Sequence, residues 1–139
     1  MLRTHFSHSI PLGLRESILV DSYGLPRYWA TVWSSLSLGH LSHNTRLMKL
    51  RYVEDAYLFA DELLGFGALD DALGFQNVEK VAGILEGFFI SLRNKATRTT
   101  SDEARWRTVY DFVSSVLSWQ SRGGLHGALS ETSKKTPPP

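Results

Sequence analysis

The residues that could carry acid–base or metal chemistry lie scattered along this sequence, without the spacing that such chemistry needs. The histidines fall where loops or helix starts are expected, and no HxxxH or HxxE pattern occurs. They are His5, His8, His40, His43 and His126. There is no cysteine and no glycine-rich phosphate loop. We therefore expect no metal, no cofactor and no catalytic site.

Two pairs of adjacent acids, Glu54-Asp55 and Asp70-Asp71, are equally unpromising as catalytic groups. Neighbouring residues on a helix do not face each other, so both pairs read as solvated charge. Tyr110 is expected on the apolar face of a helix, which makes it a poor nucleophile.

A first basic cluster lies at the start of a long predicted helix. Arg46, Lys49 and Arg51 precede the acidic residues of the same helix, although the helix dipole disfavours cations at an N-terminus by a few tenths of a kcal/mol each. Phosphate binding would explain this placement, because free N–H groups and nearby polar side chains suit an anion. Those side chains are Ser42, Asn44 and Thr45. The alternative is a solvated face with no partner.

A second basic cluster surrounds the start of the last predicted helix. It comprises Arg93, Lys95, Arg98, Arg105 and Arg107, interspersed with Thr97, Thr99, Thr100 and Ser101. Hydroxyls and cations at a helix start are typical of contacts to a DNA backbone. The alternative is a capped helix with ordinary surface arginines. Two such helix starts in one small domain favour a common binding surface.

The elements that must position these clusters are helices. Apolar residues recur at spacings of three and four, and capping residues precede them. The predicted helices are 27–38, 45–64, 77–93 and 101–122, with a strand at 17–20, a turn at 21–24 and a loop at 70–74. The chain is thus predicted to be all-α, a compact four-helix bundle at 26–122. It follows an N-terminal extension (1–25) and precedes a linker or disordered tail (123–139).

The tryptophans and two glycines complete the predicted core. Trp29, Trp33, Trp106 and Trp119 match the apolar stripes and read as buried. Gly83 and Gly87 lie four apart inside one helix, where each costs about 1 kcal/mol relative to alanine. Close approach of another helix would explain them.

Several of these segments resemble a known family. Residues 15–26 (RESILVDSYGLP) with Tyr28-Trp29, then Leu41-Ser42-His43-Asn44-Thr45 and the helix behind it, are similar to the N-terminal region of integrase-type tyrosine recombinases. A later helix with Arg105, Phe112 and Trp119 continues the likeness, which spans roughly residues 15–120. The resemblance implies a SAM-like core-binding domain that grips double-stranded DNA during integration and recombination.

The resemblance also implies a contact surface and partners. By analogy, DNA contacts fall on Asn44, Thr45, Arg46, Lys49, Arg98, Thr99, Thr100, Arg105 and Arg107. We expect a C-terminal catalytic domain in the full-length protein and self-association on DNA. A bacterial or phage-encoded protein of the cytoplasm, without a membrane span, fits this class.

Two departures from the family matter. Its catalytic arginines, lysine, histidines and tyrosine have no counterpart in this chain, so a free-standing enzyme is the least favoured interpretation. The formal net charge is only +1, which predicts weak DNA binding because phosphate neutralisation supplies most of the affinity. A helical protein–protein interaction module with an exposed apolar patch is the main alternative.

Overall fold

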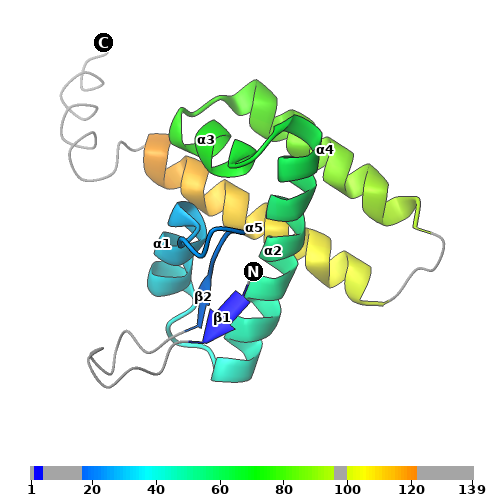
Figure 1. Cartoon of the computed structure of the whole chain (residues 1–139). Helices are drawn as coiled ribbons and strands as arrows, with labels where there is room; N and C mark the ends of the chain where they lie inside the picture. Colours follow the sequence, from blue (N-terminus) through cyan, green and yellow to red (C-terminus); the bar gives the residue numbers. More distant parts are fainter. Residues whose placement is uncertain (1, 5–16, 96–99, 122–139) are drawn as a thin grey trace, which may run out of the picture.

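A computed structural model describes residues 2–4, 17–95 and 100–121 of the chain, which form helices and one small pair of strands (Figure 1). In chain order the elements are β1 (Leu2–Thr4), β2 (Ser17–Leu19), α1 (Tyr28–Ser37), α2 (His43–Leu64), α3 (Ala68–Gly74), α4 (Val78–Arg93) and α5 (Ser101–Ser121). None of the described helices is long and apolar enough to cross a bilayer.

Helix α2 is the centre of the arrangement, because every other helix packs against it. In Figure 1, α5 crosses behind α2, with α1 on one side and α4 on the other. Tyr57 of α2 and Phe112 of α5 are fully buried where the two helices cross, and their ring centroids are 5.9 Å apart. The Trp33 ring of α1 packs edge-on against Phe112 at 5.3 Å. This contact joins α1, α2 and α5 in one core.

The all-α prediction is confirmed, but the predicted helix count is wrong. The structure describes five helices, because 70–74, predicted as a loop, belongs to α3. Its Ala68, Leu69, Ala72 and Leu73 are spaced as one helical face and are all buried. Gly67, whose φ of 77° favours glycine, lets the chain turn into this short helix.

The helix boundaries follow local capping signals. Ser42 caps α2 by accepting a hydrogen bond from the Thr45 backbone N–H, so Asn44 lies inside the helix. Asn77 caps α4 in the same way through the Lys80 N–H. The α2 helix ends at Leu64 before Gly65, as predicted. The long helices α2, α4 and α5 thus start and stop close to their predicted limits.

The N-terminal strand pair was only half predicted. β2 occupies most of the predicted strand and pairs antiparallel with β1, which the sequence did not indicate, with Arg3 opposite Ile18. The predicted turn follows. The Asp21 carboxylate accepts hydrogen bonds from the backbone N–H groups of Tyr23 and Leu25, and these hold its pKa below the ordinary value against the opposing effect of burial.

A buried polar cluster links α1, α2 and α3, and it corrects the interpretation of Asp70 as solvated charge. The Asp70 carboxylate accepts hydrogen bonds from the Tyr57 hydroxyl at 2.6 Å and from the backbone N–H groups of Tyr28 and Trp29. Asp70 therefore caps α1 from another helix, since Arg27 offers no side-chain cap. Burial raises the pKa of Asp70 although these hydrogen bonds favour its charged form.

Arg27 and Asp61 extend this cluster. Arg27 is only 4% exposed, and its Nη2 lies 2.8 Å from Asp61 Oδ2. Its guanidinium also stacks over the Tyr57 ring, 4.8 Å from the centroid. Asp61 uses its other oxygen to accept the Gly67 N–H at the start of α3. One carboxylate on α2 thus fixes both the entry to α1 and the entry to α3.

Substitution of Asp70 and of its neighbour Asp71 tests whether Asp70 has a structural role that an exposed acid lacks. Asp70→Ala removes the cap of α1 and a hydrogen-bond partner of the buried Tyr57 hydroxyl, so it should lower the free energy of unfolding by about 2–3 kcal/mol. Asp71→Ala removes an exposed carboxylate and should cost less than about 1 kcal/mol. Urea unfolding followed by circular dichroism measures both. Equal costs would contradict the capping role.

The two glycines of α4 have different surroundings, so the predicted close approach holds at one of them. A Cβ on Gly87 would meet Phe59 Cζ of α2 at 2.9 Å, whereas a Cβ on Gly83 would meet nothing within 4 Å. Gly87 therefore permits the α2–α4 packing, in which Phe59 and Phe88 contact each other at 5.8 Å between centroids. Gly83 has no such neighbour.

Alanine substitutions at Gly83 and Gly87 should change the free energy of unfolding in opposite directions. Gly83→Ala should raise the free energy of unfolding by up to about 1 kcal/mol through helix propensity. Gly87→Ala gains the same propensity but must displace the Phe59 ring, so we expect a net loss of about 1 kcal/mol or more. Thermal unfolding of the two variants provides the comparison. A gain at Gly87 would mean that the ring moves aside at little cost.

Candidate nucleic-acid interface

The start of α2 presents the first basic cluster. Arg46 turns back toward the loop after α1, where its Nη1 donates to the Leu41 carbonyl at 2.9 Å and the Gly39 carbonyl at 3.4 Å. It therefore holds the α1–α2 loop against the helix. Asn44 is exposed and Thr45 half-buried, and the Thr45 hydroxyl accepts a hydrogen bond from the Ser42 hydroxyl. Polar groups crowd this end of the helix.

Lys49 and Arg51 are the cations of this helix start that remain available to a ligand. Neither side chain forms an ion pair or hydrogen bond with another residue in the described part of the chain. Arg51 is exposed and Lys49 half-exposed. No acidic residue occurs between Asp21 and Glu54, so neither α1 nor the first half of α2 carries a negative side chain. We call Asn44, Thr45, Arg46, Lys49 and Arg51 the α2 basic surface.

The start of α5 is different, because its principal arginine is held within the protein. Arg105 Nε lies 2.7 Å from Asp55 Oδ2 of α2, and its Nη1 donates to Asp102 at 3.0 Å. The guanidinium also stacks on the Tyr52 ring at 4.8 Å. Only 19% of the side chain is exposed. Burial raises the pKa of the Asp55 carboxyl even though the adjacent Arg105 charge lowers it. Arg105 thus fastens α5 to the middle of α2.

Two further cations around α5, Arg107 and Lys95, form ion pairs with acids. Arg107 Nη2 lies 3.2 Å from Glu103 Oε1, with both side chains exposed. Lys95 Nζ lies 2.8 Å from Asp102 Oδ1. A pair that is exposed on both sides, such as Arg107–Glu103, contributes little to stability. Thr100 is exposed just before α5. Two predicted contact residues, Arg98 and Thr99, lie outside the described residues.

The structure therefore keeps the two predicted clusters apart along α2. Arg105 contacts α2 at Tyr52, ten residues beyond Ser42, which corresponds to roughly 15 Å along the helix axis. Asn44, Thr45, Arg46 and Lys49 are brought together at one end. Arg105 and Arg107 lie farther along, among acids. A surface joining both clusters would have an acidic interruption at Glu54 and Asp55.

Sequence reasoning missed an exposed aromatic surface and misplaced Tyr110. Trp33 is buried as predicted, and Trp29, Trp106 and Trp119 pack half-buried against the core. Tyr110, however, is 52% exposed because it lies beyond Trp106 on the outer side of α5. The neighbouring Phe89 of α4 is 36% exposed. The helical spacing of three and four could not separate this outer row from the core row.

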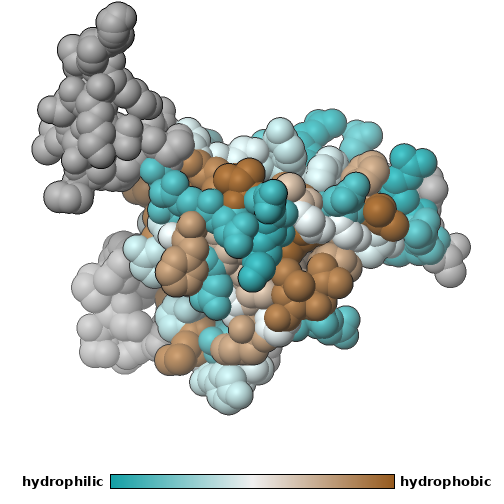
Figure 2. Space-filling view, turned by 90° about the horizontal axis from the view of Figure 1, so that it is seen from above, coloured by the Kyte–Doolittle hydropathy of each residue, from teal (hydrophilic) through white to brown (hydrophobic). Residues whose placement is uncertain are grey.

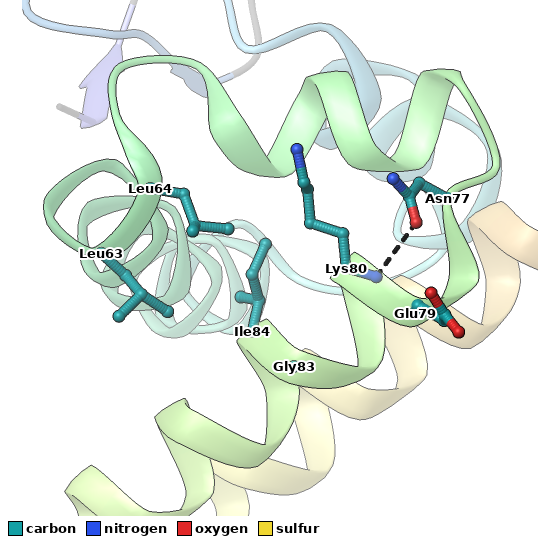
Figure 3. A pocket seen from close by; sticks show the side chains of 7 residues that line it. All are labelled: Leu63, Leu64, Asn77, Glu79, Lys80, Gly83 and Ile84. Atoms are coloured by element: carbon teal, nitrogen blue, oxygen red, sulfur yellow. Dashed lines mark hydrogen bonds between the residues drawn. The ribbon is translucent and has the colours of Figure 1, made fainter.

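A shallow pocket lies between the end of α2 and the start of α4 (Figure 3). Its volume is about 460 Å³, and it is lined by Leu63, Leu64, Asn77, Glu79, Lys80, Gly83 and Ile84. The Asn77 carboxamide oxygen already accepts the Lys80 N–H, so it serves the helix cap. Within the described ranges, no three histidine, cysteine or acidic residues are placed to hold a metal. The pocket brings together no set of groups that acid–base catalysis would need.

Comparison with known proteins identifies no relative. No family model matches the chain, and no curated protein or solved structure is significantly similar to it.

The internal role of Arg105 can be tested against the exposed arginine two residues later. Arg105→Ala leaves Asp55 and Asp102 without their cation and uncovers the Tyr52 ring, which should lower the free energy of unfolding by about 1–3 kcal/mol. Arg107→Ala removes only an exposed pair and should change it by less than about 0.5 kcal/mol. Chemical denaturation of both variants gives the answer. An unchanged stability for Arg105→Ala would show that α5 does not depend on this contact.

Proposed function

We propose that this chain is a double-stranded-DNA-binding domain of the tyrosine-recombinase type, which uses the α2 basic surface as its main contact. The observation that carries the proposal is the unbalanced positive charge at the start of α2. Lys49 and Arg51 have no acidic partner among the described residues, and the helix N-terminus next to them is itself favourable to anions. The resemblance of residues 15–120 to recombinase core-binding regions supports the same class.

In this proposal the DNA backbone lies along the first three turns of α2. Lys49 and Arg51, two residues apart and on different sides of the helix, neutralise different phosphates, while Asn44 and Thr45 supply polar contacts that set the position of the duplex. Arg46 shapes the loop that leads into the helix, because its guanidinium is bound to two loop carbonyls. It can still place positive potential near a phosphate.

Helix α5 contributes in a different way from α2. Arg105 sets the angle between α5 and α2 through Asp55 and Asp102, and it therefore acts as a positioning residue. Arg107 can leave its exposed Glu103 partner to reach a third phosphate. Catalysis of strand exchange belongs, in this proposal, to a separate C-terminal domain in a cytoplasmic, bacterial or phage-encoded protein.

The expected affinity is modest and strongly dependent on salt. Three neutralised phosphates correspond to a slope of about −2.7 for log Kobs against log salt concentration. Fluorescence anisotropy with a random duplex at about 50 mM and 200 mM salt should therefore show binding that weakens by one to two orders of magnitude. Absence of binding at the lower concentration would overturn the proposal for this chain.

A charge-matched pair of variants locates the surface. Lys49→Glu should weaken duplex binding by about tenfold or more, because it replaces a phosphate contact with a repulsive charge. Lys80→Glu makes the same change in net charge on α4, beside the pocket, and should leave affinity within about twofold. Anisotropy titrations at fixed salt measure both. Equal losses would mean that only overall charge matters and that the α2 basic surface is not the contact.

A further inference from the structure

The outer face of α4 carries hydrophobic side chains that the fold does not cover. Phe89 is 36% exposed and Ile90 is 48% exposed, and both point away from the packing that places Ile84 and Phe88 in the core. Figure 2, which shows the molecule from above, has hydrophobic patches among hydrophilic side chains on the face in view. An uncovered isoleucine next to a phenylalanine costs solubility unless a partner uses it.

This face continues onto α5 through a chain of ring contacts. The Phe89 and Trp106 centroids are 5.0 Å apart, and those of Trp106 and Tyr110 are 5.9 Å apart. Arg93 lies at the edge of the group, with its guanidinium 5.6 Å from the Phe89 centroid. Tryptophan, tyrosine, phenylalanine and arginine are the residues enriched at the centres of protein–protein interfaces. We call Glu86, Phe89, Ile90 and Arg93, with Trp106 and Tyr110 beside them, the α4 outer face.

The charges of the α4 outer face identify its partner. Glu86 and Arg93 are seven residues apart, so they lie on one stripe of the helix with Phe89 and Ile90 between them. The stripe therefore has a negative charge at one end and a positive charge at the other, so it is complementary to a second copy that runs in the opposite direction. An antiparallel second helix of the same sequence places Glu86 opposite Arg93 at both ends and Phe89 opposite Ile90 in the middle.

Nucleic acid fits this face poorly. Glu86 lies at one end of the stripe, and Glu103, which pairs with Arg107, lies one turn before Trp106 on α5, so this face carries charges of both signs and not the positive charge that a phosphate backbone needs. A protein partner with an equally mixed charge pattern meets no such penalty. A second copy of the chain has that pattern by construction, and a two-fold axis uses the same patch on both copies.

We propose that two copies of this chain associate through the α4 outer face as an antiparallel, two-fold symmetric pair. The Glu86 and Arg93 side chains form two equivalent ion pairs across the axis, and Phe89 and Ile90 pack between them. Trp106 and Tyr110 widen the apolar contact at its edge. This association needs no DNA, and it does not depend on the proposed function.

Charge reversal at Glu86 and Arg93 distinguishes loss of the proposed ion pairs from general damage to the fold. Sedimentation velocity of the chain, without DNA, should show a reversible monomer–dimer equilibrium. Glu86→Arg and Arg93→Glu should each weaken dimerisation at least about tenfold, because each places like charges opposite one another at both ends. Lys80→Glu changes an exposed residue on another side of the same helix, outside the stripe, and should leave dimerisation unchanged.

The decisive step is to combine the reversals. The double variant Glu86→Arg/Arg93→Glu should regain dimerisation, and an equimolar mixture of the two single variants should form heterodimers although neither forms homodimers. Circular dichroism establishes that each variant is folded. A chain that stays monomeric at all accessible concentrations, or single variants that dimerise as well as the unmodified chain, would overturn the proposal. Neither result bears on duplex binding by the α2 basic surface, which is measured separately.

Discussion

The carboxylate of Asp70 on α3 links α1 and α2 through hydrogen bonds to residues that are distant in the sequence. It accepts the first backbone N–H groups of α1, which have no cap of their own, and it accepts the hydroxyl of Tyr57 at the centre of α2. The hydroxyl in turn accepts the N–H of Ala30. The buried Arg27–Asp61 pair lies beside this cluster and supplies its positive charge. Leaving any of these groups unpaired in the core would cost the desolvation energy that the hydrogen bonds now offset.

This cluster explains why α3 exists despite its length. Seven residues form only about two helical turns, too few to be stable alone. The helix persists because one face is buried, because Asp61 caps its entry through Gly67, and because Asp70 on it is bound to α1 and α2. Short helices of this kind take their stability from tertiary contacts.

The parts of the fold that sequence could predict are those fixed by local rules. The limits of α2 and α4 follow from Ser42, Asn77 and Gly65, whose capping or terminating roles depend on neighbours within a few residues. Helix α3 and the role of Asp70 were missed because the partners of Asp70 lie up to 42 residues away in the sequence. The exposed cations of α2 were found from their position. The ion pair between Arg105 and Asp55, by contrast, depends on where α5 crosses α2. The spacing of apolar residues along each helix does not predict this crossing point.

The long-range cap of α1 also has a kinetic meaning. The backbone N–H groups of Tyr28 and Trp29 donate to the Asp70 side chain of α3. Their protection from hydrogen exchange therefore depends on this tertiary contact and not on local hydrogen bonds within α1. Their protection is lost whenever α3 separates from the start of α1, and they exchange with that opening. A nascent chain that has not yet formed α3 therefore lacks this cap of α1.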